Sequence, residues 1–204
     1  MSFLPTTEQI RNVFNDEIAA VGGNVTDCYD DGRRLYLRST VPLSAEVRPA
    51  DSVQGGVALR ATADDILVHP YTFRQVCRNG AIIAHAIETR ELQRVPDTDP
   101  DENVEEKLVE LRDAVRECAS EQAFSAAAAE MRSAVDAPAD FVLNIMSMFS
   151  RVSKDMVDQL LDILERFESQ HDRSAFGLMN AVTSAARDAR NPETRWRLEE
   201  LGGA

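Results

Sequence analysis

Arginine and tyrosine residues in the first half of the chain recur at spacings that would place them on shared faces. Arg34, Tyr36 and Arg38 alternate along the chain, and in a β-strand every second side chain points to the same face. Arg74 and Arg78 are four residues apart, which would put both on one side of a helix. Guanidinium groups bind phosphate and aromatic rings stack on bases, so such a surface could hold single-stranded nucleic acid. The candidate nucleic-acid site therefore contains Arg34, Tyr36, Arg38, Arg60, Arg74 and Arg78.

Nearby carboxylates offer a second interpretation of the same arginines. Residues 24–95 contain nine arginines and nine acidic residues, so this section carries no net charge. Pairing between such groups on a solvated face is common and contributes little energy. On composition we favour pairing, and nucleic-acid binding would require a groove whose arginines are not neutralised by local acids.

The net charge of the chain is −13, and most of it belongs to the second half. From residue 96 onward there are 23 acidic residues against 12 basic ones. This balance argues against a surface that attracts nucleic acid everywhere, although a local basic groove is compatible with it. Of the 22 basic residues 20 are arginines, a bias that we attribute to genome composition rather than to site chemistry.

Residues that could act in catalysis or bind metal are scattered along the chain. His69, Cys77 and His85 match no known zinc spacing, and zinc needs three or four converging ligands. The three cysteines include no CxxC pair. The sequence has no phosphate loop, no GxGxxG, no HExxH and no GxSxG turn. We therefore assign no catalytic residue, no cofactor and no metal, and we interpret Cys77 as a small buried residue.

The elements that would position these residues follow from hydrophobic periodicity. Apolar residues at spacings of three and four predict a helix over residues 7–21, ended by Gly22-Gly23. Asp31-Gly32 predicts a hairpin turn. Residues 70–78 are predicted as a short helix closed by Asn79-Gly80. Alternating or apolar runs predict strands over residues 25–29, 35–41, 53–61, 66–69 and 81–87.

The second half is predicted to be helical. Residues 96–102 form a turn-rich acidic linker, and a long helix is expected over 103–135. That helix has an apolar seam of heptad-like spacing, formed by Val104, Leu108, Leu111, Val115 and Cys118. The seam could serve a partner or a homo-oligomer, but we favour packing within the chain. Further helices are predicted over residues 141–149, from 153 or 155 to 167, over 174–189 and over 194–201.

These elements together predict an α+β protein. An N-terminal helix precedes a mainly antiparallel twisted sheet with a short inserted helix, and a C-terminal helical region follows. Residues 1–95 are the β-rich portion, 96–102 the linker and 103–204 the helical portion, which could pack on the sheet as one domain. We see no signal peptide and no apolar window near the roughly 18 residues of a membrane span. We therefore expect a cytoplasmic protein without a membrane partner.

Two short runs, one in each half, carry a family resemblance. The first places Arg74, Cys77, Asn79 and Gly80 in the order R-x-x-C-x-N-G, and the second is the N-A-V-T run of residues 180–183. Both resemble signatures of a phage- and plasmid-like protein family classed as a domain of unknown function. The resemblance spans roughly residues 30–203 and implies an origin in a mobile element or prophage, with no established reaction. Its motif residues in this chain are Cys77, Asn79, Gly80, Asn180 and Thr183.

The motif residues also have a physical interpretation. Asn79-Gly80 would cap a helix, and Cys77 would lie in the core beneath it. Asn180 and Thr183 are unusual inside a helix because their side chains compete with backbone hydrogen bonds. We expect them to bond to the sheet or its loops.

Three functional hypotheses follow. In the first, a mobile-element protein handles single-stranded nucleic acid through its arginine-bearing sheet, with steep salt dependence. In the second, a non-enzymatic interaction or anti-defence protein uses its acidic helical half to bind a basic host protein. An enzyme is the third and ranks last, because no convergent titratable cluster is evident in the sequence.

Overall fold

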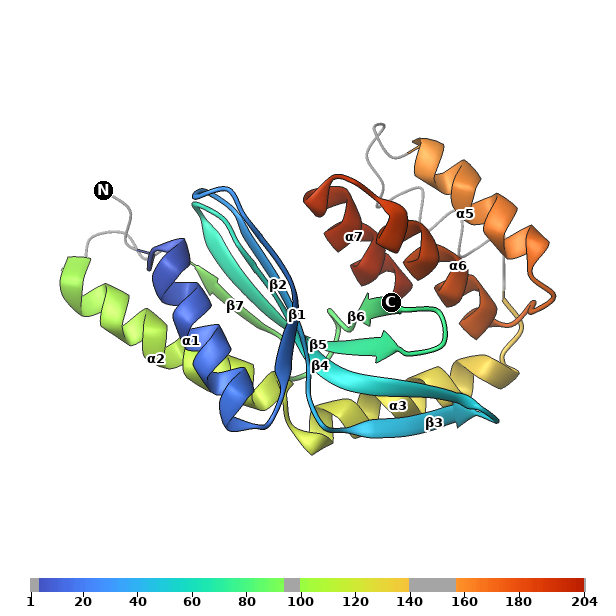
Figure 1. Ribbon diagram of the computed structural model, residues 1–204, viewed down its shortest axis with the longest axis horizontal. Helices are drawn as coiled ribbons and strands as arrows, with labels where there is room; N and C mark the ends of the chain where they lie inside the picture. The colour runs from blue at the N-terminus through green and yellow to red at the C-terminus, as the bar shows by residue number, and fades with distance from the viewer. Residues whose placement is uncertain (1–3, 94–99, 140–156, 204) are drawn as a thin grey trace.

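The computed structural model describes residues 4–93, 100–139 and 157–203. A helix, a sheet and then further helices follow in order, which confirms the predicted α+β class (Figure 1). The strands are β1 Asn24–Asp30, β2 Leu35–Thr40, β3 Ser44–Arg48, β4 Asp51–Ala61, β5 Asp65–Arg74, β6 Asn79–Ile82 and β7 Arg90–Gln93. The helices are α1 Thr7–Ala20, α2 Pro100–Cys118, α3 Glu121–Asp136, α5 Val157–Ser169, α6 Ala175–Asp188 and α7 Pro192–Gly202.

The seven described strands form one antiparallel sheet with two long central members. Its order is β1-β2-β4-β5-β6, while β3 also pairs with β4 and β7 also pairs with β5. β4 and β5 pair along almost their whole length, from Val53 opposite Arg74 to Ala61 opposite Ile66. The first half of β4 pairs with β3 and its second half with β2. Each central strand therefore connects two parts of the sheet.

Local signals explain α1 and the first hairpin, both as predicted. The Thr6 hydroxyl accepts a hydrogen bond from the Gln9 N–H at 3.2 Å. The Gln9 side chain accepts one from the Thr6 N–H at 2.9 Å, which completes a capping box. Between β1 and β2 the Asp31 carboxylate accepts from the Arg34 N–H at 2.7 Å, and Gly32 adopts a φ of +79° that suits glycine.

The prediction of a short helix over residues 70–78 is wrong. β5 continues as a strand to Arg74, a turn spans residues 75–78, and β6 begins at Asn79. Asn79-Gly80 therefore starts a strand instead of capping a helix. The aromatic and β-branched residues of this run suit a pleated strand, and pairing with β4 on one side and β6 on the other stabilises it.

Other strand predictions also need correction. The strand predicted over residues 81–87 begins two residues earlier and ends at Ile82. β3 and β7 were not predicted, because their short sequences are polar or charged and show little alternation. Both take their place through pairing with a central strand, which no local pattern reveals.

Helices cover both faces of the central strands. α1 and α2 cover one face and bury Leu59, while α3 extends the same layer over Val53. On the opposite face α7 places Trp196 against Tyr36 of β2. α6 contacts β6 and α7, and α5 packs on α6 (Figure 1). Every residue of β2 is consequently buried, so this strand offers no open face to a ligand.

The helix predicted over residues 103–135 is two helices. Ser120 interrupts it, and the Ser120 hydroxyl begins α3 by accepting a hydrogen bond from the Ala123 N–H at 3.1 Å. The predicted seam packs within the chain, as favoured, against α1 and the sheet. Its buried members are Leu108, Leu111, Val115 and Cys118.

The remaining helices follow their predictions closely. Ser174 caps α6, and α7 begins at Pro192. The helix predicted over residues 141–149 and the predicted helix start at 153 or 155 lie outside the described residues. The linker predicted over 96–102 lies partly outside them, and its last three residues begin α2. Helices α2, α3, α6 and α7 all contact strands of the sheet.

Candidate functional site

The two family-like runs meet in space. Asn79, at the start of β6, donates from Nδ2 to the Thr183 hydroxyl of α6 at 2.5 Å. Thr183 in turn donates to the Met179 carbonyl at 2.9 Å, so its oxygen accepts from the Asn79 amide group. The expectation that polar residues of this helix bond to the sheet is confirmed for Thr183. We call this region the motif junction, comprising Arg74, Cys77, Asn79, Gly80, Asn180 and Thr183.

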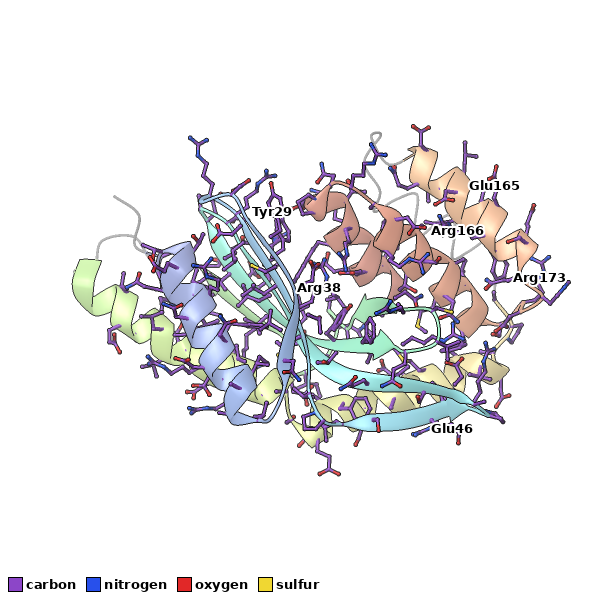
Figure 2. The ribbon with its side chains drawn as sticks, in the orientation of Figure 1. Tyr29, Arg38, Glu46, Glu165, Arg166 and Arg173 are labelled. Carbon is purple, nitrogen blue, oxygen red and sulfur yellow. The ribbon has the colours of Figure 1, made fainter. Side chains whose placement is uncertain are left out.

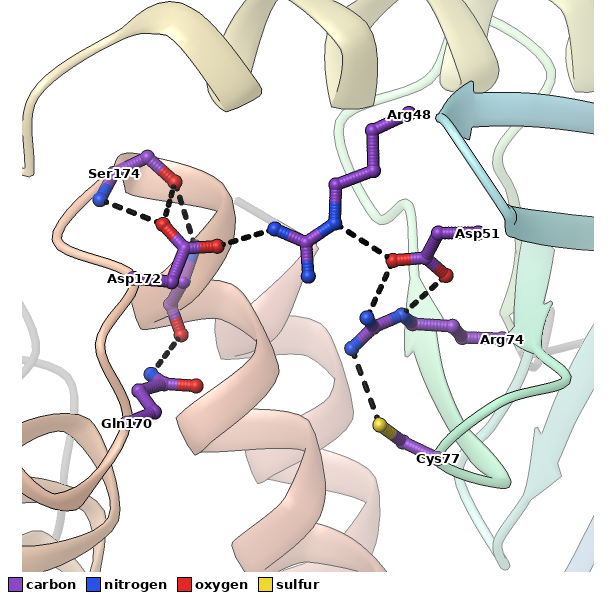
Figure 3. A network of polar contacts seen from close by, with 8 residues as sticks. Arg48, Asp51, Arg74, Cys77, Gln170, Asp172 and Ser174 are labelled. Carbon is purple, nitrogen blue, oxygen red and sulfur yellow. Dashed lines mark hydrogen bonds and ion pairs between the residues drawn. The ribbon is translucent and has the colours of Figure 1, made fainter.

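Arg74 belongs to a chain of charge-assisted hydrogen bonds beside the motif junction (Figure 3). Its Nε donates to Asp51 Oδ1 at 2.7 Å, and its Nη2 donates to Asp51 Oδ2. Arg48 donates from Nε to Asp51 at 3.0 Å and from Nη1 to Asp172 at 2.6 Å. Asp172 also accepts from the Ser174 N–H and hydroxyl. The chain of bonds thereby joins three strands to the start of α6.

Aromatic packing and electrostatics reinforce this arrangement. The guanidinium groups of Arg48 and Arg74 lie over the Phe176 ring, 5.0 and 5.2 Å from its centroid. Burial favours the neutral form of Asp51, but the two arginines outweigh it and hold the pKa of that carboxyl below its usual range. The pKa of Asp172 is also lowered, since hydrogen bonds from Ser174 and Arg48 outweigh its burial. Both carboxylates are therefore ionised at neutral pH.

Cys77 is half-buried in the turn beside this network, so its interpretation as a small buried core residue is wrong. Its Sγ accepts a hydrogen bond from Arg74 Nη1 at 3.3 Å, and its carbonyl accepts one from Arg187 at 2.8 Å. No described histidine hydrogen-bonds to this thiol. A nucleophilic cysteine needs an adjacent base, and the contacts of Cys77 are instead those of a residue that closes the turn between β5 and β6.

Tyr36 and Arg38 lie on the face of β2 that α7 covers. Figure 2 labels Arg38, which lies between the sheet and the C-terminal helices. Arg38 is 2% exposed and donates to Glu199 at 2.6 Å and to Asp27 at 3.1 Å. The Tyr36 hydroxyl donates to Glu193 at 2.5 Å, and burial together with this carboxylate raises the pKa of Tyr36. Both side chains hold α7 on the sheet and face no open surface.

The other three predicted nucleic-acid residues lie apart from one another. Arg34 pairs with Asp31 in the first hairpin at 2.8 Å. Arg60 pairs with Asp65 at 3.0 Å. Arg78 is exposed, adopts a φ of +53° and forms no ion pair with a described residue. The structure therefore brings together only Tyr36, Arg38 and Arg60, through α7, and Arg74 belongs to a separate network.

Possible metal ligands among the described residues do not cluster. No group of three His, Cys, Asp or Glu side chains among them is arranged to hold a metal ion. His69 is buried and bonded to Thr89, while His85 pairs with Glu130 at the surface. Within the same ranges, no helix combines the length and apolar character needed to cross a membrane. The polar networks described above connect the helices to the sheet.

A charged surface remains after these networks are accounted for. The layer of α1, α2 and α3 contains 13 acidic and 5 basic residues, whereas α7 on the opposite face contains 3 acidic and 2 basic ones. We call α1, α2 and α3 the acidic layer. The sequences of α1, α2 and α3 therefore carry more than half of the chain's net charge of −13. α5, which packs on α6, contains a further 4 acidic residues against 1 basic residue.

Three of the five basic residues of the acidic layer form ion pairs with acids of the same layer. Arg116 pairs with Glu17 at 2.6 Å, Lys107 with Glu110 at 2.6 Å, and Arg112 lies 3.8 Å from Glu105. The exposed acids without an ion pair to a described residue include one from each helix. These are Asp16, Glu106 and Glu121.

Several residues of these networks were missed from sequence. Asp172 lies 124 positions from Arg48, and Glu199 lies 161 positions from Arg38, so no spacing rule links them. Phe176 is likewise remote in sequence from Arg48 and Arg74. Asp51 could have been suspected, because Arg48 lies three residues before it and the pair flanks a turn.

Comparison with models of known protein families, with curated proteins and with solved structures found no match to this chain.

Proposed function

We propose that this protein is a non-enzymatic accessory protein of a mobile genetic element, which binds a basic host protein through its acidic layer in the cytoplasm. The observation that carries the proposal is the charge asymmetry, with 13 acidic and 5 basic residues on one helical layer. The mobile-element setting rests on the resemblance of the two motif runs. The hydrogen bond between Asn79 and Thr183 joins these two runs and holds α6 against β6.

Electrostatics indicate the kind of partner. A dense negative field attracts a positively charged surface and speeds its association. Proteins that bind nucleic acid present such surfaces, so a host protein of this class is the partner we propose. Exposed Val109 on α2 lies among the acids and would add an apolar contact at the centre of the interface.

Single-stranded nucleic-acid binding is the second candidate. In its favour, Arg78 is exposed and forms no ion pair with a described residue. Against it, Tyr36, Arg38 and Arg74 are buried and bonded within the chain. A strand of nucleic acid would reach Tyr36 and Arg38 only if α7 separated from the sheet.

Matched charge variants can separate the two candidates. The layer variant carries Asp16→Asn, Glu106→Gln and Glu121→Gln, and the control variant carries Asp158→Asn, Glu165→Gln and Glu168→Gln on exposed positions of α5. Both change the net charge by the same amount. Fluorescence anisotropy would then measure binding of a labelled arginine-rich peptide and of a labelled single-stranded oligonucleotide across a salt series.

The proposal predicts salt-sensitive peptide binding that weakens in the layer variant and persists in the control variant. Equal weakening in both would show that only net charge matters and would contradict an acidic-layer site. Oligonucleotide binding that is lost in Arg78→Ala would favour the second candidate.

A further inference from the structure

Among the described residues several buried side-chain polar atoms lack a hydrogen-bond partner, and two of them belong to the neighbouring strands β5 and β6. Asn79 is 3% exposed and Thr72 is 2% exposed, yet Asn79 Oδ1 accepts no hydrogen bond and the Thr72 hydroxyl neither donates nor accepts one. Burying such a group without a partner is costly, so native proteins normally satisfy it with protein or with ordered water. The two atoms therefore point to a further ligand.

Strand register places the two side chains together. Arg74 is opposite Asn79 and Thr72 is opposite Ala81, so Thr72 and Asn79 are diagonal neighbours on one face of the β5–β6 pair. Both line a cavity of about 10 Å³ at the motif junction. Asn180 of α6 lines it as well and has no side-chain hydrogen bond to a described residue. A space of this size is sufficient for one water molecule.

We propose that this cavity is a binding site for one buried water molecule. The Asn79 amide nitrogen is committed to Thr183, which leaves its Oδ1 as an acceptor facing the cavity. The water donates to Asn79 Oδ1 and bonds to the Thr72 hydroxyl, and the Asn180 amide supplies a third partner. Buried waters typically make about three such bonds. The site links β5, β6 and α6, and it gives Asn79 and Asn180 of the family-like runs one shared ligand.

Nuclear magnetic resonance on the whole protein tests the proposal directly. A bound water should give a nuclear Overhauser cross-peak to the Thr72 methyl group and to the Asn79 side-chain amide, with the sign that distinguishes it from hydrogen exchange. The Val57 methyl groups are the control, because Val57 is buried and the Ser39 hydroxyl is already bonded to the Val57 backbone. They should show no cross-peak.

The substitution Thr72→Val adds an independent readout. If the hydroxyl binds water, removing it lowers the midpoint of urea unfolding and weakens the water cross-peak to Asn79. If the hydroxyl is simply unpaired, its removal relieves a burial cost and raises the midpoint, which would overturn the proposal. A lowered midpoint with no water cross-peak in the wild type would also overturn it, in favour of a direct Thr72–Asn79 bond.

Discussion

Replacing Arg74 by methionine tests whether this arginine is structural or available to a ligand. The substitution keeps an unbranched side chain but removes the guanidinium group that donates twice to Asp51. Asp51 is 4% exposed and would keep Arg48 as its remaining ionic partner. The matched control is Arg34→Met, which removes the same two kinds of hydrogen bond from exposed Asp31.

The expected loss follows from the burial of the carboxylate. Removing one partner of a buried ion pair costs about 3 to 5 kcal/mol, and we expect the lower end because Arg48 remains. In a protein of this size a loss of about 3 kcal/mol lowers the melting temperature by roughly 6 to 12 °C. Arg34→Met should change the melting temperature far less, since water solvates the Asp31 carboxylate that it leaves.

Thermal unfolding followed by circular dichroism measures both variants under one condition. If Arg74→Met and Arg34→Met shift the melting temperature equally, Asp51 is not desolvated and our structural interpretation of Arg74 is refuted. Adding Asp51→Asn to Arg74→Met should recover part of the loss, because the unpaired charge is then removed.

Two further predictions concern a buried histidine and a pair of glycines. Burial and a nearby arginine lower the pKa of His69 from 6.5 to about 4, so the folded state resists its protonation while the unfolded chain accepts it. The unfolding free energy should therefore fall by about 2 kcal/mol between pH 6.5 and about pH 5. Urea titrations should show that His69→Gln abolishes this loss, whereas the control His85→Gln keeps it. Gly56→Ala should destabilise far more than Gly55→Ala, because its Cβ would lie 1.9 Å from the Ser39 carbonyl oxygen, whereas the Cβ at Gly55 meets a side chain at 2.8 Å. Equal melting temperatures for the two alanine variants would contradict this packing.

Local signals made part of the fold predictable. The capping box at Thr6, the hairpin turn at Gly32 and the cap at Ser174 each involve residues at most three positions apart. Such signals act through the nearest backbone groups, so they keep their meaning without knowledge of the rest of the chain.

The parts of the fold and of the candidate site that could not be predicted depend on contacts between residues far apart in the sequence. β5 is a strand because it pairs with β4 on one side and with β6 and β7 on the other. Arg38 and Tyr36 were correctly placed on one face, but nothing local showed that α7, more than 150 residues later, covers that face. Only Tyr36, Arg38 and Arg60 of the candidate set come together in the structure, and their partners on α7 were not predicted.

At the motif junction, too, the residues could be predicted from the sequence but their contact could not. Asn79 and Thr183 were singled out by their residue types, and their mutual bond spans 104 positions. The acidic layer was visible only as an excess of acids after residue 96. Its concentration over one face depends on how α1 packs beside α2.

Affinity capture from an extract of the organism that carries this chain tests the central claim most directly. Wild type, the layer variant and the α5 control variant would be immobilised, and proteins released by salt would be identified by mass spectrometry. We predict a basic protein that binds wild type and the control variant but not the layer variant. Capture of the same proteins by all three, or retention of nucleic acid alone, would contradict a protein-binding role for the acidic layer.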